Sequence, residues 1–517
     1  MTRHLPALWQ TMLFTALLTT SPVLAEDQGR SISESDPETG RTVFRFETFG
    51  NEGFWTDAMR LPQGIMAEKL TLRDLLEVGL HIDSEALGRE FTQKLIAETK
   101  SDLSPKQAPL MNDPELTGKL VQIKAVIGVV PVDSDGDGKM DLKKGDKLGV
   151  SCAICHTVTD GSVYSLPGKG SIGKRLDGRA THSLDLGNIL ATAANSRAYY
   201  PNLQLELGGK TIGRAPTGIR PDSTEAEVDA YLKNDKFYPR GTFDDTQDGI
   251  GNPVQNTPLF RQDLAAPYGS SGLHEKFEGI TNASFTTNLD LTTMATPEGG
   301  AFLKTLGGKA GEELHQNYVT ILKETGVEDF PFVKAERSGK VGHRDTPVGL
   351  QVDMQKLLDL KAYTFSLQAP PGAAKLSTAA TQGMKLFAAN CTTCHNADPD
   401  DAVSAEILPF EKVWPGYEPK AMEKRKMPLS PITDSKGIYD DKAVIVDASE
   451  RGEKRGVALP LLLDLARKPA LLHDNSVATL DELLDPMRGA EAPHPFYVED
   501  RQERAAMTAF LKQLSAR

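Results

Sequence analysis

The 517-residue sequence predicts a mainly α-helical protein of two domains, with long loops and a little β structure. Three observations lead to this fold class. The pentapeptide Cys-x-x-Cys-His occurs twice, far apart, and uses all four cysteines of the chain. Stretches with apolar residues at steps of three and four, which is the helical period, flank the second copy. The 45 glycines and 32 prolines indicate many turns and long connections. A chain of this length exceeds one hydrophobic core.

Residues 1–25 have the pattern of a secretory signal peptide. Arg3 supplies a positive start, residues 12–18 form an apolar run, and Val-Leu-Ala at 23–25 is a small-residue cleavage site. The apolar run is too short to cross a bilayer, so we expect cleavage rather than anchoring. The sequence therefore predicts an exported, periplasmic protein with no membrane span after signal removal.

The charge balance bears on partners. The formal net charge is −13, and the signal carries one Arg and no acid, which leaves 57 − 71 = −14 in the mature chain. An acidic chain is a poor ligand for nucleic acid, because phosphate binding needs clustered cations. It suits a positively charged protein partner.

The paired cysteines carry the strongest chemical signal. Disulfides are the default in an exported protein, and a redox dithiol and a zinc site are further alternatives. Two Cys-x-x-Cys-His units would offer six ligands, whereas zinc takes four. Covalent haem attachment needs this pentapeptide as it stands, because two thiols bond the haem and the adjacent imidazole binds its iron. We predict two c-type haems: haem 1 on Cys152, Cys155 and His156, and haem 2 on Cys391, Cys394 and His395.

The surroundings of the second copy predict a helical domain. In TQGMKLFAANCTTCH, Gly383, Phe387 and Cys391 fall on one helical face. This resembles the first helix of class I cytochromes c. Near the chain end, Asp500 and Glu503 form a capping box before an apolar stripe that includes Phe510. A first helix carrying the haem and a last helix crossing it would close a cytochrome c-like domain.

The first copy has different neighbours. No helix of that type directly precedes it, and KLVQIKAVIGVVPV has the β-branched composition of a strand. DSDGDGKMDLKK follows, with calcium-loop residues at positions 1, 3, 5, 7 and 9: Asp133, Asp135, Asp137, Lys139 and Asp141. Lys144 stands at position 12, where an EF-hand has Glu. We therefore predict a calcium loop of another kind, completed by Asp146, over the alternative of a solvated turn.

A diverged repeat follows each copy. Pro258 and Pro267 are nine residues apart, as are Pro460 and Pro469, and each second proline precedes a turn and a helix-like segment. In the ungapped alignment His473 is matched by Ser271, and Met487 has no matching Met. A haem iron with two strong ligands is closed and suits electron transfer, whereas one with only its proximal His is open to peroxide or oxygen. The repeat therefore predicts one closed and one open haem.

The run HDNSVATLDELLDPM at 473–487 carries a family resemblance. It resembles the bacterial dihaem cytochrome c peroxidase superfamily, which includes the dihaem enzyme that matures methylamine dehydrogenase. The resemblance implies that Met487, fourteen residues after His473, binds the electron-transfer haem. The branch of the dihaem rubber oxygenases instead uses the His itself, and HPFYV at 494–498 looks closer to that branch. We favour His473 over Met487, and Met427 in KMPLSP is a third candidate.

Other side chains are weaker candidates. His182 is the nearest histidine downstream of haem 1 and is a candidate acid–base group or distal ligand, although a lone His in a polar loop is more often solvated. His274 and Met294 are further candidates for that place. Arg214 and Arg220 could bind haem carboxylates.

We divide the chain into the signal at 1–25, an N-terminal region at 26–120 with one helical stretch, a haem 1 domain at 121–345 and a haem 2 domain at 346–517. The predicted function is a dihaem oxidoreductase that moves electrons from haem 2 to haem 1 for peroxide or oxygen reduction. The alternatives are an electron-transfer cytochrome serving a periplasmic dehydrogenase, and a gas sensor. The expected partner is a small cytochrome, a cupredoxin or a dehydrogenase.

Overall fold

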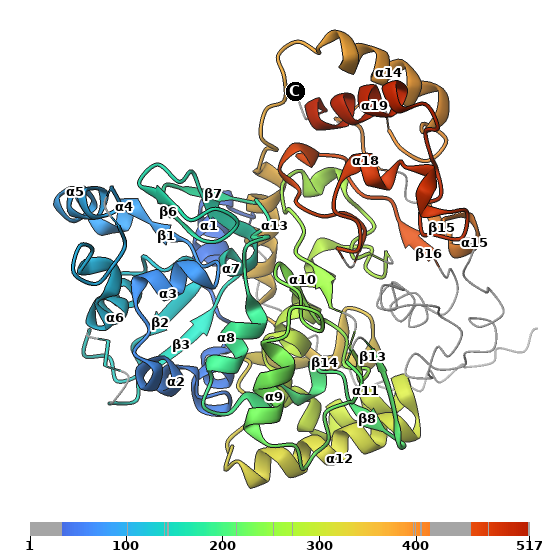
Figure 1. Ribbon diagram of the computed structural model, residues 1–517. Coiled ribbons are helices and arrows are strands. Elements are labelled where there is room, and N and C mark those ends of the chain that lie inside the picture. Colours follow the sequence, from blue (N-terminus) through green and yellow to red (C-terminus); the bar gives the residue numbers. More distant parts are fainter. Residues whose placement is uncertain are drawn as a thin grey trace, which may run out of the picture. The chain divides into compact units, whose positions relative to one another are not determined.

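The computed structural model describes residues 34–514 except 101, 139, 142–143, 214, 252, 271, 397, 399, 404–405, 414–455 and 474 (Figure 1). The elements below belong to one unit that begins at Ser35. Helices hold 43% of the chain and strands 14%, in separate sheets of two or three strands, which confirms the mainly α class with a little β. None of the described helices has the length and apolar character that a bilayer crossing requires.

The N-terminal part consists of short helices around a leucine-rich core. They are α1 (Pro37–Phe46), the π-helical η1 (Phe54–Ala58), α2 (Leu61–Glu68), α3 (Leu72–Glu77), α4 (Ser84–Leu87), α5 (Arg89–Glu98), η2 (Leu110–Asn112) and α6 (Pro114–Gln122). The prediction of one helical stretch in this region was wrong, because further helices are present. Helices α1 and α6 begin at the N-cap residues Asp36 and Asp113, whereas α5 has no side-chain cap, and each of the three buries only part of one face. The predicted strand from Lys119 was also partly wrong, since residues 119–122 end α6 and only Val129–Val132 is a strand.

Small sheets lead into and out of the first pentapeptide. Strand β2 (Val129–Val132) pairs antiparallel with β3 (Lys147–Val150), and α7 (Ala153–His156) follows. The other strands of this part are β1 (Ile82–Asp83), β4 (Thr157–Thr159), β5 (Tyr164–Ser165), β6 (Ser171–Gly173) and β7 (Arg175–Asp177). The order β1-β6-β5 and the pair β4-β7 fix the segment after His156 against the N-terminal helices.

The middle of the chain forms the largest core. Its helices are α8 (Leu186–Thr192), η4 (Ser196–Asn202), α9 (Glu225–Leu232), η5 (Gln262–Leu264), α10 (Phe277–Ala283), η6 (Ser284–Asn288), η7 (Leu291–Ala295), α11 (Pro297–Gly307) and α12 (Lys309–Glu324). Its strands are β8 (Glu206–Leu207), β9 (Lys210–Gly213), β10 (Thr242–Phe243), β11 (Ile250–Gly251), β12 (Val254–Gln255), β13 (Ala335–His343) and β14 (Thr346–Val352). The hairpins β10–β12 and β13–β14 reach the site described below.

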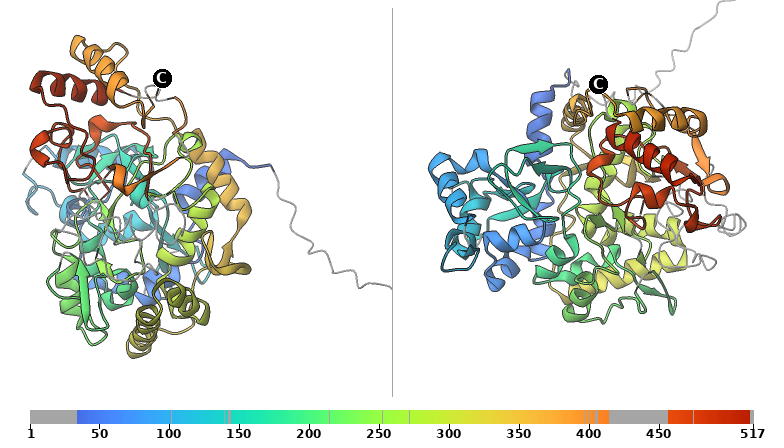
Figure 2. Two further views of the ribbon diagram at one scale, coloured as in Figure 1. Left: turned by 90° about the vertical axis from the view of Figure 1, so that its right-hand side faces the viewer. Right: turned by 45° about the horizontal axis from the view of Figure 1, so that its top comes forward.

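The C-terminal part contains the predicted crossing helices. Helix α14 (Thr378–Asn390) leads into Cys391, and α19 (Arg501–Gln513) packs across it in both views of Figure 2. A Cβ on Gly383 would lie 2.1 Å from the Ala506 carbonyl oxygen, so only glycine permits this approach. The rings of Phe387 and Phe510 close the contact at 5.4 Å. The remaining elements are α13 (Met354–Ser366), β15 (Ile407–Pro409), α15 (Phe410–Val413), β16 (Gly456–Ala458), η8 (Leu465–Arg467), α18 (Leu480–Leu483) and η9 (Pro486–Arg488).

The first half contains the same helix pair. Helix α1 packs against α13, a Cβ on Gly40 would lie 1.9 Å from the Asp359 carbonyl oxygen, and the rings of Phe44 and Tyr363 lie 5.5 Å apart. Glycine and aromatic are four residues apart on α1, as on α14. A helix of the expected type therefore does precede the first pentapeptide, but far upstream. The domain boundaries at residues 121 and 345 remain a prediction. Helix α1 lies before the first of these boundaries and α13 lies after the second.

A long insertion separates α1 from its haem motif. The two ends of this insertion, residues 47–150, lie close together. There the Ser151 hydroxyl donates to the Arg45 carbonyl oxygen at 2.8 Å. In the second half no insertion is present at this place: Cys391 comes four residues after Phe387, and its N–H donates to the Phe387 carbonyl oxygen at 2.8 Å. The equivalence of α1 and α14 could not be predicted from the sequence, because local patterns do not connect residues that lie this far apart in the chain.

The repeat after each pentapeptide is also present, in a shifted register. Equivalent features lie 203 residues apart: the left-handed residues Arg261 and Asp464, the β-bridges Tyr268–His274 and Leu471–Val477, and the helix starts Phe277 and Leu480. The proline spacing had indicated 202. Ser270, rather than Ser271, thus stands at the position of His473, and Ser271 lies outside the described residues.

Candidate functional site

A cavity of about 1460 Å³ lies between the two halves. Both pentapeptides line it with their cysteines and histidines: Cys152, Cys155, His156, Cys391, Cys394 and His395. Pockets for ordinary small ligands measure roughly 300–1,000 Å³. The two motifs that the sequence singled out therefore line one cavity, which is larger than a single small ligand needs.

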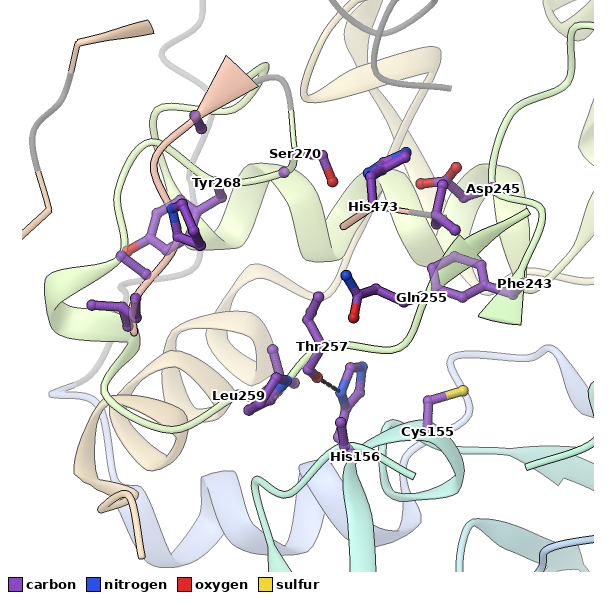
Figure 3. A pocket seen from close by; sticks show the side chains of 18 of the residues that line it. Cys155, His156, Phe243, Asp245, Gln255, Thr257, Leu259, Tyr268, Ser270 and His473 are labelled. Carbon is purple, nitrogen blue, oxygen red and sulfur yellow. Dashed lines mark hydrogen bonds between the residues drawn. The ribbon is translucent and has the colours of Figure 1, made fainter. Parts of the chain in front are cut away.

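The first pentapeptide holds its histidine in a defined tautomer. His156 ends α7, and its Nδ1 donates to the Thr257 carbonyl oxygen at 2.8 Å (Figure 3). Since Nδ1 carries the proton, Nε2 keeps its lone pair for a metal. Burial lowers the pKa of His156 to about 4, so the ring is neutral at pH 7.

The cysteines are not joined to one another. Burial raises the pKa values of Cys152 and Cys155 to about 12, which keeps both thiols protonated at neutral pH. In the part of the chain that the structure describes, the one cluster of three potential metal-binding side chains is Asp133, Asp135 and Asp137. The cysteines and histidines of the two motifs are thus not gathered into one tetrahedral site.

At the second pentapeptide, His395 lies close to a histidine that the sequence analysis had not proposed as a ligand. The ring centroids of His395 and His494 are 6.3 Å apart, with an angle of 48° between the planes. Both rings line the cavity, and the Nδ1 atom of each is buried with no hydrogen-bond partner. HPFYV had been noted only for the resemblance it carries, because 99 residues of chain separate the two histidines.

The three side chains predicted as ligands of haem 2 differ in whether they line the cavity. His473 lines the cavity, and its carbonyl oxygen accepts from the Gln255 N–H of the first half at 2.9 Å. Figure 3 shows its imidazole at the same end of the pocket as Asp245, with Gln255 between them and His156. Met487 is 89% exposed on η9 and does not line the cavity. Met427 lies outside the described residues.

The two halves exchange equivalent contacts at this point. Gln255 N–H donates to the His473 carbonyl, and Ala458 N–H donates to the Ser270 carbonyl, both at 2.9 Å. By the 203-residue register these are the same contact made in opposite directions. Such reciprocity is the mark of a two-fold relation, here between repeats of one chain. The loop closed by the Leu471–Val477 bridge thus contacts β12 of the first half, and the loop closed by the Tyr268–His274 bridge contacts β16 of the second half. We call these two segments the closing loops.

Cations gather on one wall of the cavity. A short strap is fixed to the first motif, since Gly178 N–H donates to the His156 carbonyl at 2.8 Å and Thr181 N–H to the Cys155 carbonyl at 2.9 Å. The strap carries Arg179, and Lys468 comes from the second half; neither forms an ion pair within the described residues. Burial lowers the pKa of Lys468 to about 8 and that of Arg179 below its usual range.

Of the other predicted side chains that the structure describes, two line the cavity, His182 and His274. His182 lines the cavity, and burial, with the Lys468 charge nearby, lowers its pKa to about 4. His274 also lines it, but its Nδ1 is held by the Asp345 carboxylate at 2.9 Å. Met294 is fully buried in the core and does not reach the cavity. Arg220 is paired with Asp222 on the surface, and Arg214 lies outside the described residues.

Asp245 is an acid that the sequence analysis missed. It lines the cavity, its Oδ1 is buried without a hydrogen-bond partner, and burial together with the Asp248 charge raises its pKa to about 7. A carboxyl whose pKa is raised toward neutral pH can give or take a proton. Nothing in DDTQDG distinguishes this aspartate from its neighbours, because the shift comes from tertiary burial.

The predicted calcium loop joins β2 to β3. Oxygens of Asp133, Asp135 and Asp137 lie within 4.8 Å of one another, and all three side chains are exposed. The Asp141 carboxylate instead lies 3.7 Å from Lys144. Asp146 accepts from the backbone N–H groups of Ser134 and Asp141 at 2.8 and 2.7 Å, so it ties the loop together. Lys139 lies outside the described residues.

Comparison with known proteins adds little. No protein family matches the chain, and no curated protein matches it. Among solved structures, a chain of Kuenenia stuttgartiensis hydrazine synthase, pressurised with 20 bar xenon, matches with 16% identity, over 52% of this chain and 74% of that one, at a TM-score of 0.26. A TM-score this low assigns neither fold nor function.

Proposed function

We propose that the protein is a periplasmic dihaem c-type cytochrome with one haem at each pentapeptide. The observation that carries this proposal is the single cavity lined by both Cys-x-x-Cys-His motifs. Each motif offers two thiols and an imidazole to the same space, which is the donor set that covalent haem needs. The tautomer of His156, fixed by Thr257, leaves Nε2 for iron.

The cationic wall fits the same group. Lys468 is largely and Arg179 partly removed from water, and neither forms an ion pair within the described residues. Buried charges are costly unless an anion joins them. The carboxylates of a haem would supply that partner. Because Arg179 lies on the strap bonded to Cys155 and His156, this pairing would place haem 1 against residues of the second half.

We further propose an oxidoreductase that moves electrons from haem 2 to haem 1 for peroxide or oxygen reduction. A haem with one free coordination position supplies an iron that binds and reduces such molecules. Asp245 would hold a proton at its carboxyl on the same cavity, and His182, neutral at pH 7, could accept one. In the first repeat Ser270 stands in place of His473, and the Nδ1 of His274 in the same closing loop is held by the Asp345 carboxylate.

The calcium loop and the partner complete the proposal. An ion on Asp133, Asp135 and Asp137 would brace the hairpin that leads into Cys152. A small cytochrome, a cupredoxin or a dehydrogenase with a basic face would deliver electrons to the acidic chain.

The test is an EPR spectrum of the protein matured in a periplasm, taken fully oxidised and after reduction by one electron. A high-spin signal beside a low-spin signal in either state would support an open haem 1, and turnover with peroxide would then be measured. Two low-spin signals in both states would contradict the peroxidase proposal and leave an electron carrier. A polypeptide mass without two added haems would contradict the dihaem proposal itself.

A further inference from the structure

The spacing of the His395 and His494 rings leaves room for one metal ion between them. Their ring centroids are 6.3 Å apart. Two metal–nitrogen bonds of about 2.0 Å, together with the distance from each bonding nitrogen to its ring centre, put opposed centroids roughly 6 Å apart. Tilted ring contacts also occur at this distance, as between Phe387 and His395 at 6.3 Å, so the position of the ring nitrogens must carry the argument. No hydrogen bond joins His395 and His494 within the described residues.

The exposure of the ring nitrogens fits such a bridge. In both rings the Nδ1 atom is buried and has no hydrogen-bond partner. The Nε2 atoms are not among the buried atoms and make no hydrogen bond, and both rings line the cavity. Each imidazole therefore presents its Nε2 edge to the cavity that the thiols of Cys391 and Cys394 also line.

His494 is held firmly in this position. Its backbone is left-handed, with φ at 55°, and its N–H donates to the Val413 carbonyl at 2.6 Å. The preceding Pro493 carbonyl accepts from Arg488 at 2.8 Å, and the Phe496 ring packs edge-on at 5.1 Å. A non-glycine residue keeps this backbone only where its surroundings impose it.

The first half lacks a counterpart. His494 lies seven residues before the start of α19, and the residue seven before the start of α13 is Pro347. The two helices are equivalent, since Tyr363 and Phe510 stand at the same helix position against the glycine-bearing helix. Pro347 lines the same cavity but offers no side-chain donor atom.

We propose that His494 is the second axial ligand of haem 2, opposite His395, and that Pro347 leaves the corresponding side of haem 1 without one. The inference rests on the proposed dihaem function and goes beyond it by naming the ligand. It replaces His473 and Met487 in that role. Haem 2 would be six-coordinate and low-spin, with a lower reduction potential than a His/Met pair would give.

The test uses the full chain matured in a periplasm, with His494→Gly and His494→Met. In the glycine variant we expect the low-spin EPR signal of haem 2 to be lost, a new high-spin signal to appear, and added imidazole to restore the low-spin signal. In the methionine variant we expect a low-spin haem with a shifted near-infrared band and a raised potential. The controls are His473→Gly and Met487→Leu, which should leave the haem 2 signal unchanged.

The outcomes separate this inference from the proposed function. Mass spectrometry of each variant counts the attached haems. Fewer than two haems in the unchanged protein would overturn the dihaem proposal. Two haems with an unchanged low-spin signal in His494→Gly, or with an unchanged near-infrared band and potential in His494→Met, would overturn the role of His494 alone, as would loss of the low-spin signal in His473→Gly. Circular dichroism checks that each variant is folded, and the methionine variant keeps the question answerable if the glycine variant is not.

Discussion

In both halves of the molecule a glycine lets the first helix touch the last, and an aromatic pair closes the contact: Gly40, Phe44 and Tyr363 in one, Gly383, Phe387 and Phe510 in the other. The halves differ in what surrounds the histidine of each pentapeptide. The ring of His156 is anchored to a backbone carbonyl, whereas that of His395 has no such anchor and lies beside His494. Under the proposed function, the common skeleton would position a haem in each half, and these side chains would decide whether it is open or closed.

The largest expected effect comes from removing one attachment site at a time. In the Cys152→Ala/Cys155→Ala double variant we expect one haem to be lost, leaving only the low-spin signal. In Cys391→Ala/Cys394→Ala we expect the other to be lost, leaving only the signal of the open haem. Mass spectrometry and EPR measure both. Identical spectra from the two variants would contradict the division of roles between the halves.

The next effect concerns Asp245, a cavity-lining acid of the first half. If Asp245 donates a proton, peroxide turnover should fall as pH rises through about 7, because the protonated carboxyl is present below that pKa and lost above it. Asp245→Asn should lower turnover by about 10²–10⁴-fold and remove this pH dependence. Asp222→Asn, on an exposed carboxylate, is the control. An unchanged pH profile in Asp245→Asn would remove this residue from the reaction.

A smaller effect tests the shared skeleton. Gly40→Ala and Gly383→Ala should each lower the free energy of unfolding by about 1–3 kcal/mol, since the new Cβ would collide with a backbone carbonyl of the crossing helix. Gly118→Ala in α6 meets no atom within 4 Å and should instead raise stability by roughly 0.5–1 kcal/mol. Denaturant unfolding followed by circular dichroism gives these values. No loss in either helix pair would contradict the close approach.

The smallest effect is that of calcium. At ten times its dissociation constant, calcium should raise the free energy of unfolding by about 1.4 kcal/mol. Asp135→Asn with Asp137→Asn should abolish the gain, and magnesium serves as the control ion. Thermal unfolding with and without a chelator measures it. Equal stability in both conditions would leave the loop as a solvated acidic turn.

The sequence alone predicted the features that depend on residues close together in the chain. The two pentapeptides, the helix that leads into Cys391 and the apolar face of the last helix all follow from spacings of a few residues, because helical period and covalent attachment are local. The composition and these helices also predicted the mainly α class, which the structure confirms.

Only the tertiary structure decided the features that join distant segments. Helix α1 pairs with α13 although residues 47–353 lie between them. The hydrogen bond of Ser151 to Arg45, which closes the insertion at 47–150, has no sequence signature. Backbone bridges, rather than prolines, set the register that places Ser270 opposite His473. The approach of His494 to His395 and the burial that shifts Asp245 arise from packing, since proximity and desolvation exist only once the chain has folded.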